Sequence, residues 1–308
     1  MEAMKALHDL AAPAKLNLFL HVVGKREDGY HLLQSVFVLI DWADTLHVER
    51  RGDGLLQRHD VLGGDLPADY LCLRAARLLQ QETGCTLGAD IHLEKRLPAG
   101  AGMGGGSSDA ATTLLALNRL WDLRLPLDRL KALGLKLGAD LPFFLGGGPA
   151  FVEGIGEILH PLTLPEQRFA VLKGPAGLAT KDIFSSPHLA RSEKLAIVAG
   201  FPALAGTAYE LITGFGQDFG RNDLQPAAES ISSEVRDALA LLSEVFGNAR
   251  MTGSGAAVFS VLAGDGKDGK DDQSLATLLQ GLSKEGPEGW TGRICRSLAQ
   301  HPLSGWAD

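Results

Sequence analysis

The chain has 308 residues, of which 45% are hydrophobic and 21% are charged, a composition typical of a globular protein. Its length predicts two domains, because single domains seldom exceed roughly 250 residues. The net charge of −8, without a basic tail or a cluster of Lys and Arg, argues against nucleic acid as a partner.

Hydropathy and cysteine usage predict a cytoplasmic protein. No apolar run approaches the roughly 20 residues of a membrane-spanning helix, and the first residues lack the apolar stretch of a secretory signal. We therefore expect no membrane partner. Cys72, Cys85 and Cys295 form no CxxC pair, which predicts reduced thiols in the core rather than disulfides or a zinc site.

Hydrophobic periodicity divides the first half of the chain into strands and helices. A polar turn at residues 25–29 separates the first two strands, which predicts an antiparallel meander. Gly84 is expected to end the first helix. The predicted strands cover residues 16–22, 31–41, 45–50 and 91–96, and the predicted helices cover 68–83, 109–121 and 128–137.

The pattern changes between residues 154 and 160, which predicts an N-terminal domain over 1–156 and a C-terminal domain over 157–308. Residues 264–272 are rich in Gly, Asp and Lys and predict a mobile loop. The mixture of elements predicts an α+β fold. In the second half, the predicted strands cover 168–173, 256–262 and 291–295, and the predicted helices cover 229–246 and 274–284.

A glycine-rich segment between a predicted strand and a predicted helix is the most distinctive feature of the sequence. Five of the seven residues from Gly100 to Gly106 are glycines, and Ser107 or Ser108 is expected to cap the helix that follows. Without side chains, backbone N–H groups can approach phosphate oxygens, and the helix dipole adds partial positive charge. The segment therefore predicts a phosphate-binding loop rather than a simple turn.

Other phosphate-binding motifs fit this segment less well. Gly100, Gly102 and Gly105 satisfy the G-x-G-x-x-G pattern, but residues 91–96 alternate in polarity, whereas the strand before a dinucleotide-binding loop is a continuous apolar run. No Gly-Lys pair is followed by Ser or Thr, so a Walker A loop is absent. The H-R-D motif of protein kinases is absent too.

Three motifs resemble, in order, those of the GHMP kinases, a superfamily of small-molecule kinases. The central one is the glycine loop with its Ser-Ser pair, in which Met103 stands where leucine is usual. The others are Pro13-Ala14-Lys15-Leu16-Asn17-Leu18 and Thr252-Gly253-Ser254-Gly255-Ala256. The resemblance implies a two-domain α+β GHMP kinase fold with a ferredoxin-like C-terminal domain and an active site in the cleft between the domains.

Further motifs are similar to one branch of this superfamily. They are Arg26-x-Asp28-Gly29-Tyr30-His31, Gly138-Ala139-Asp140-Leu141-Pro142 and Phe151-x-Glu153-Gly154. That branch phosphorylates the 2-hydroxyl of a methylerythritol linked to cytidine diphosphate, in the non-mevalonate route to isoprenoid precursors. The resemblance thus implies ATP and Mg²⁺ as cofactors and a small-molecule substrate carrying cytidine diphosphate. Tyr70 stands where the branch often has an asparagine associated with adenine.

The resemblance also implies residue roles. Lys15 and Asp140 would be catalytic, because lysine can stabilise developing charge and aspartate can accept the proton of the substrate hydroxyl. The expected ATP-binding residues are Lys95, Pro98, Gly100, Gly102, Gly104, Gly105, Gly106, Ser107 and Ser108. The expected substrate-binding residues are Asn17, Tyr30, His31, Asp140, Thr180, Phe184 and Gly253, with the aromatic residues forming a cytidine pocket.

Residue types alone leave structural alternatives open. A lysine on a strand face, such as Lys15 or Lys95, is usually solvated, and Asp140 suits a turn cap. Ser107 is a candidate magnesium ligand, but no carboxylate ligand is evident, so the metal ligands are unknown. The rival functions are another GHMP kinase, of the homoserine or mevalonate type, and a non-catalytic relative that binds ligand. We expect a monomer or weak homodimer.

Overall fold

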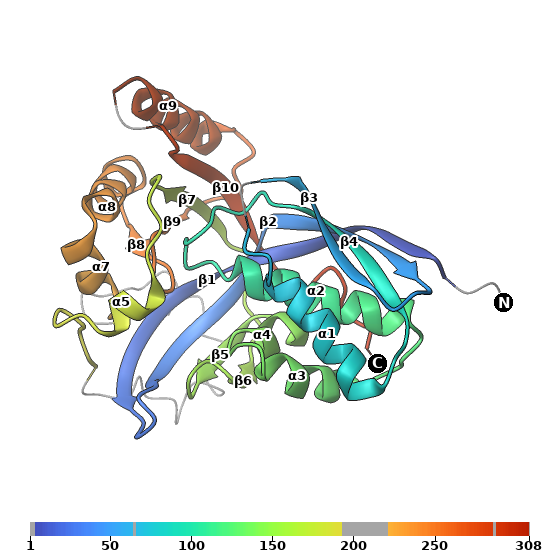
Figure 1. Ribbon diagram of the computed structural model, residues 1–308. Helices are drawn as coiled ribbons and strands as arrows, with labels where there is room; N and C mark the ends of the chain where they lie inside the picture. Colours follow the sequence, from blue (N-terminus) through green and yellow to red (C-terminus); the bar gives the residue numbers. More distant parts are fainter. Residues whose placement is uncertain (1–3, 64–65, 193–220, 286–287, 308) are drawn as a thin grey trace.

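The computed structural model describes residues 4–63, 66–192, 221–285 and 288–307. Two long antiparallel strands, β1 (Ala6–Lys25) and β2 (His31–Arg51), run through the molecule (Figure 1). The predicted strands over 31–41 and 45–50 are one continuous strand, which was predicted wrongly as two. In its pairing with β1, Pro13 lies opposite Ala43 and Ala14 lies opposite Ile40, so residues 41 and 42 of β2 form a bulge instead of a turn.

The rest of the first half packs helices onto this pair of strands. The predicted antiparallel pairing of the first two strands is confirmed. β4 (Gly88–Glu94) pairs antiparallel with β2 and parallel with β3 (Leu56–Leu62), a strand that was not predicted. The short strands β5 (Ala150–Glu153) and β6 (Ile158–Pro161) complete this part. The helices are α1 (Leu71–Thr83), α2 (Gly105–Leu120), α3 (Leu127–Leu135) and α4 (Leu141–Gly146).

The second half has the β-α-β-β-α-β order of a ferredoxin-like fold, with strands arranged β10-β7-β9-β8. A helical insertion, α5 (Thr180–Phe184), follows the first strand. The strands are β7 (Arg168–Lys173), β8 (Arg250–Met251), β9 (Val258–Leu262) and β10 (Thr291–Leu298), and the remaining helices are α7 (Gln225–Ile231), α8 (Ser233–Phe246) and α9 (Lys270–Glu285).

Two predicted elements of this half are corrected. The helix predicted over 229–246 is interrupted at Ser232, whose extended backbone and side-chain oxygen, 3.3 Å from the Val235 N–H, begin α8 as an N-cap. The loop predicted over 264–272 ends early, since α9 begins at Lys270. Acidic Asp271 and Asp272 in its first turn suit the positive end of the helix dipole.

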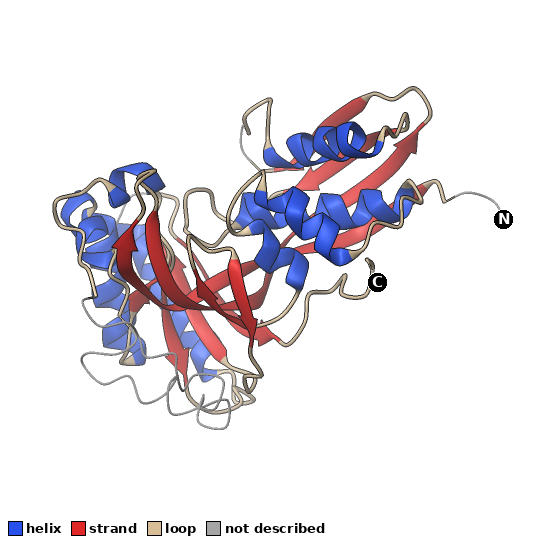
Figure 2. Ribbon diagram, turned by 90° about the horizontal axis from the view of Figure 1, so that it is seen from below, coloured by secondary structure: helices blue, strands red, loops and turns tan. Residues whose placement is uncertain are grey.

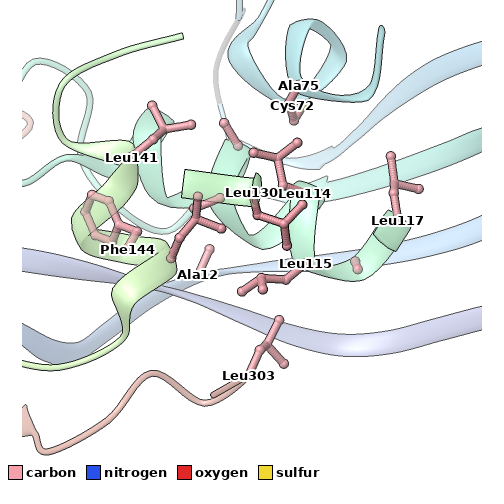
Figure 3. Packing of buried hydrophobic residues seen from close by; sticks show 14 of the residues in the cluster. Ala12, Cys72, Ala75, Leu114, Leu115, Leu117, Leu130, Leu141, Phe144 and Leu303 are labelled. Carbon is pink, nitrogen blue, oxygen red and sulfur yellow. The ribbon is translucent and has the colours of Figure 1, made fainter. Parts of the chain in front are cut away.

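The two halves are joined twice near the end of the chain. β10 pairs with β7 along its length and reaches β2 through Ser297 and Leu298. The tail after β10 then returns to the first half, where Leu303 is buried in the same cluster as Leu115 of α2 and Phe144 of α4 (Figure 3). The predicted domain division near residue 156 stays a prediction. Leu303 and Ala307, near the end of the chain, belong to the core of the first half.

Apolar packing places the helices in separate groups around the sheet. Helices α1 to α4 share one core, α7 and α8 share another, and a third cluster lies on β1, β2, β7 and β9. Figure 2 shows the helices gathered in separate groups around the strands. Cys72 and Cys295 are buried, and the three cysteines are free thiols, as predicted. Among the described helices, none combines the length and apolar character required to traverse a bilayer.

Candidate functional site

A cleft of about 940 Å³ gathers the predicted site residues. It lies where the glycine loop meets β1, the start of α4, α5 and the turn before β9. The predicted residues that line it are Lys15, Asn17, Tyr30, His31, Lys95, Pro98, Gly100, Gly102, Gly104, Gly105, Gly106, Ser107, Asp140, Thr180, Phe184 and Gly253. Ser108 does not line it, because its buried hydroxyl donates to the Pro13 carbonyl at 2.7 Å.

Helix α2 begins earlier than predicted, and its cap is a glycine. Gly104 occupies the N-cap position with a φ of 73°, so neither Ser107 nor Ser108 caps the helix. A side chain at Gly104 would be strained at this φ, and a Cβ would lie 2.7 Å from the Phe144 ring. The tight packing of Phe144 against the backbone therefore requires glycine and places the first turn of α2 at the cleft.

Backbone hydrogen bonds hold the glycine loop on both sides. The Lys15 N–H donates to the Met103 carbonyl at 3.0 Å, and the Ala256 N–H donates to the Gly100 carbonyl at 2.9 Å. At Gly102, a Cβ would lie 2.5 Å from the Thr252 carbonyl oxygen. The loop is thus fixed between β1 and the Thr252–Ala256 turn. The first N–H groups of a helix have no intrahelical acceptor, so the start of α2 suits an anion.

Lys15 and Asp140 face each other in the cleft. Lys15 Nζ lies 3.7 Å from Asp140 Oδ2 and donates to Asn17 Oδ1 at 2.5 Å. The ammonium also sits 4.3 Å from the centroid of the Phe37 ring. The Lys15 side chain is only 5% exposed, which rules out the alternative that it is a solvated lysine on a strand surface. Burial lowers the pKa of Lys15, and the neighbouring Asp140 carboxylate opposes this shift.

Asn17 is held by residues that sequence reasoning did not assign to the site. Its backbone N–H donates to Thr252 Oγ1 at 2.9 Å, and its amide nitrogen donates to Ser35 Oγ at 3.0 Å. Both hydroxyls are buried. They fix the amide so that its oxygen faces Lys15, and this links the first and last of the three sequence motifs. A lone Ser in an apolar strand such as β2 was the only signal for Ser35.

Lys95 is part of a buried ion cluster beneath the glycine loop. Its ammonium bonds to Asp44 and, at 2.8 Å, to Asp109 Oδ2, which also accepts from the Tyr70 hydroxyl at 2.9 Å. Both carboxylates are fully buried. Burial alone would lower the pKa of Lys95, but Asp109 and Asp44 outweigh it and raise the pKa. Lys95 lines the cleft, yet its charge is already balanced by protein groups.

Asp109 shows how this cluster could have been found. Burial raises its pKa to about 7; Lys95 opposes the shift and Asp44 adds to it. The neighbours of Asp109 in α2 are almost all small or apolar and buried. An aspartate inside such a run signals a buried partner, since carboxylates are rarely buried unpaired. That signal was present in the sequence.

The opposite end of the cleft carries the predicted cytidine residues. The His31 and Phe184 rings stack with centroids 5.0 Å apart, and Tyr30 is 59% exposed beside them. Burial, together with Lys25 and Arg191, lowers the pKa of His31, which favours the neutral imidazole. Thr180 Oγ1 lies 2.8 Å from Ser254 Oγ.

Few protein ligands for a metal line the cleft. Across the described ranges, no group of three or more His, Cys, Asp or Glu side chains is placed to hold an ion. Magnesium in kinase sites usually keeps several waters and relies on substrate phosphates, with one or two protein ligands. Ser107 and Asp140, which line the cleft near the glycine loop, fit this sparse pattern.

Known proteins resemble both halves of the chain. The family model of the GHMP kinases N terminal domain matches residues 70–148, and that of the GHMP kinases C terminal matches residues 202–288. A 4-diphosphocytidyl-2-C-methyl-D-erythritol kinase from Methylibium petroleiphilum is 54% identical over 99% of both chains. Its counterpart from Variovorax paradoxus is 53% identical over 99% of this chain and 100% of that protein.

Solved structures extend the comparison. A crystal structure of 4-(cytidine 5'-diphospho)-2C-methyl-D-erythritol kinase is 34% identical, with a TM-score of 0.72, and the match covers 93% of this chain and 98% of that one. Homoserine kinase from Cytophaga hutchinsonii is 16% identical with a TM-score of 0.68, covering 98% and 97% of the two chains, and this shows a shared fold alone. The predicted α+β GHMP kinase fold is confirmed.

Proposed function

The chain belongs to the 4-diphosphocytidyl-2-C-methyl-D-erythritol kinases of the GHMP superfamily, and we propose that it transfers the γ-phosphoryl group of ATP to the 2-hydroxyl of 4-diphosphocytidyl-2-C-methyl-D-erythritol. This reaction belongs to the non-mevalonate route to isoprenoid precursors. The resemblance to homoserine and mevalonate kinases extends to the fold only, and the presence of both Lys15 and Asp140 argues against a non-catalytic relative.

The observation that carries the chemistry is the Lys15–Asp140 pair, 3.7 Å apart beside an anion-binding helix start. Asp140 accepts the proton of the substrate hydroxyl while the hydroxyl oxygen forms a bond to the γ-phosphorus. The bond from that phosphorus to the β-γ bridging oxygen breaks, and ADP leaves. Lys15 stabilises negative charge on the oxygens of the transferring group. Phosphoryl transfer depends mainly on such positioning and electrostatics.

Lys15 is well placed for this role because its surroundings fix its charge and position. The Asn17 amide oxygen and the Phe37 ring hold the ammonium, while Asp140, with 32% of its side chain exposed, faces the open cleft. Burial of the lysine increases the strength of its electrostatic interactions, since the local dielectric constant is lower than in water. The exposed face of Asp140 leaves room for an incoming hydroxyl.

ATP binds with its phosphates at the glycine loop and the first turn of α2 in this proposal. Ser107, at the start of α2, is the described group that would complete the shell of a magnesium ion carried by the phosphates, since Asp140 is assigned to the proton transfer. The ion would neutralise part of the phosphate charge. Lys95, through its bonds to Asp44 and Asp109, joins the segment before the glycine loop to α2 after it.

The cytidine group occupies the aromatic end. His31 and Phe184 stack on each other without space between them, so a pyrimidine would extend this stack or separate the rings. One nitrogen of the neutral imidazole can donate to the ring-nitrogen acceptor on the edge of cytosine. We also propose a cytoplasmic enzyme that is a monomer or weak homodimer; sedimentation at several protein concentrations tests the assembly state.

A coupled assay of ADP release tests the reaction. The expected result is turnover with 4-diphosphocytidyl-2-C-methyl-D-erythritol and little with homoserine, mevalonate or free sugars. Methylerythritol phosphate without the cytidine group should be nearly inert, because remote binding energy contributes to the rate of transfer. Equal turnover of homoserine or mevalonate would leave only the superfamily assignment standing.

A further inference from the structure

Lys173 is a buried cation outside the proposed mechanism. It ends β7, is 4% exposed, and its Nζ donates to three successive carbonyls, Gly174 at 2.7 Å, Pro175 at 3.2 Å and Ala176 at 3.1 Å. Burial lowers the pKa of its ammonium, and the nearby Glu234 carboxylate opposes this shift. A buried ammonium that binds main-chain carbonyls instead of a carboxylate fixes the path of those residues.

Glu234 holds the same segment from the other side. This residue lies in the first turn of α8, and its Oε2 accepts from the Ala176 N–H at 2.7 Å. A Cβ at Gly174 would lie 2.8 Å from that oxygen. Two charged side chains from β7 and α8 therefore determine the course of residues 174–176, which connect β7 to α5.

The continuation of this segment touches both walls of the cleft. A Cβ at Gly177 would lie 3.2 Å from Gly100 Cα, and the Leu178 N–H points to the Gly100 carbonyl at 3.4 Å. Leu178 lines the cleft, and two residues later α5 begins, carrying Thr180 and Phe184. The segment is thus packed against the loop proposed for ATP and leads directly into the helix proposed for cytidine.

We propose that Lys173 and Glu234 are positioning residues for phosphoryl transfer, which set the placement of α5 relative to the glycine loop. This inference rests on the proposed function, because it assigns the two walls to two ligands. The glycine loop has other anchors, at Lys15 and Ala256. Residues 174–178, in contrast, have one described hydrogen bond to the glycine loop, from the Leu178 N–H to the Gly100 carbonyl. Their other described hydrogen bonds are those with Lys173 and Glu234.

Removal of the Lys173 ammonium should therefore affect the two substrates differently. In Lys173→Met, three carbonyls lose their donor, and the segment relaxes. The KM for ATP should change by less than about twofold. The KM for the cytidine compound should rise roughly fivefold or more, since α5 must be ordered on binding. The kcat should fall by about tenfold or more, because a displacement of about 1 Å can reduce a rate by about 100-fold.

Steady-state kinetics of Lys173→Met, Glu234→Ala and a matched control test this proposal. The control is Arg168→Met at the other end of β7, which is 5% exposed and pairs with Asp271 of α9, away from the cleft. It should lose stability but keep both KM values and kcat. Calorimetric titration with ATP and with cytidine diphosphate accompanies the assay, so that binding is measured separately from turnover.

The outcomes separate this inference from the proposed function. Lys173 and Glu234 are positioning residues if Lys173→Met and Glu234→Ala lose kcat and acceptor affinity but retain ATP affinity, while wild type and Arg168→Met turn over the cytidine compound. If all four proteins behave alike, or if Lys173→Met and Glu234→Ala lose only stability, the inference is overturned while the function stands. Absence of turnover by the wild type would overturn the proposed function itself.

Discussion

The two ends of the cleft are built differently. At the proposed phosphate end, hydrogen bonds from β1 and from the turn before β9 fix the glycine loop, and buried Lys95 joins the segment before the loop to Asp109 of α2 after it. At the proposed cytidine end, His31 and Phe184 stack mainly on each other, and Tyr30 is 59% exposed. The proposed transfer site is therefore held by many polar contacts, whereas the groups proposed to recognise the base are held by few.

This difference assigns rate and selectivity to separate parts of the molecule. Electrostatic stabilisation is most effective when the charged groups do not have to move during the reaction. Side chains that select a base act by hydrogen-bonding to its edge and by stacking on its face. Changes at the phosphate end should thus reduce rates or ATP binding, and changes at the cytidine end should alter which substrate is preferred.

The largest effect is expected at the catalytic pair. Asp140→Asn should lower kcat by about 10²–10⁴-fold with little change in ATP affinity, because the base acts mainly in the transition state. Lys15→Met should behave similarly through loss of its charge. Rapid-quench measurement of phosphoryl transfer, with ATP affinity from calorimetry, checks both. Near-normal turnover by folded Asp140→Asn would refute its role as base.

Substitution in the glycine loop should abolish ATP binding. In Gly104→Val, a branched side chain would meet Phe144 and would be strained at a φ of 73°. Gly264→Val is a matched control, because Gly264 has the same φ of 73° but nothing within 4 Å of its Cβ position. It should lose stability alone. Circular dichroism must show both variants folded, and unchanged ATP affinity in Gly104→Val contradicts the phosphate-loop assignment.

Acid should destabilise the first half of the molecule through the C-terminal tail. His301 is buried, its backbone N–H donates to the Gly147 carbonyl at the end of α4, and its ring Nδ1 accepts from the Leu303 N–H at 3.1 Å. Burial lowers the pKa of its imidazole to about 4. The unfolded state, with a pKa near 6.5, binds the proton first, so stability is complete above pH 6.5 and falls towards pH 4. The loss should reach roughly 3 kcal/mol. Denaturant unfolding of wild type and His301→Phe measures it; equal acid sensitivity of the two contradicts this role.

A smaller effect concerns the base of the phosphate donor. The Tyr70 hydroxyl donates to Asp109, so it is not directed at a base, and Tyr70 stands where an amide is frequent in the family. We expect ATP to be preferred over GTP by less than about tenfold, roughly one hydrogen bond. Tyr70→Asn should increase this preference. A strong preference in the wild type would mean that backbone groups or Lys95 read adenine.

Sequence reasoning located most of the structure where local signals were strong. Residues 168–173 form the predicted strand, and Gly84 ends α1 with a φ of 67°. Sequence reasoning failed where tertiary contacts determine the position at which an element begins or ends. The cap of α2 is Gly104, because Phe144 packs on it, although two serines nearby have higher N-cap preference. The break between α7 and α8 was missed although Ser232, a preferred N-cap residue followed by Glu234 in the first turn, carried a local signal for it.

The candidate site shows the same limit. The resemblance to the GHMP kinases implied that Lys15 and Asp140 act together, and they lie 3.7 Å apart although they are distant in sequence. The Lys95 cluster was not predicted, because the aspartate in the apolar run of α2 signals a buried partner without identifying it, and the partners come from other elements. Lys173 was also missed, since its partners are main-chain carbonyls, which carry no sequence signal.

The ratio of kcat/KM for the cytidine compound to that for its uridine analogue tests the separation of rate and selectivity most directly. Uracil reverses the donor and acceptor pattern of cytosine, so wild type should prefer cytidine by about tenfold or more per unpaired group. Asp140→Asn should keep this ratio at a much lower rate, and Phe184→Ala should weaken both substrates alike. His31→Ala should bring the ratio close to one while retaining transfer. An unchanged ratio in His31→Ala, or a lost ratio in Asp140→Asn, would contradict the separation.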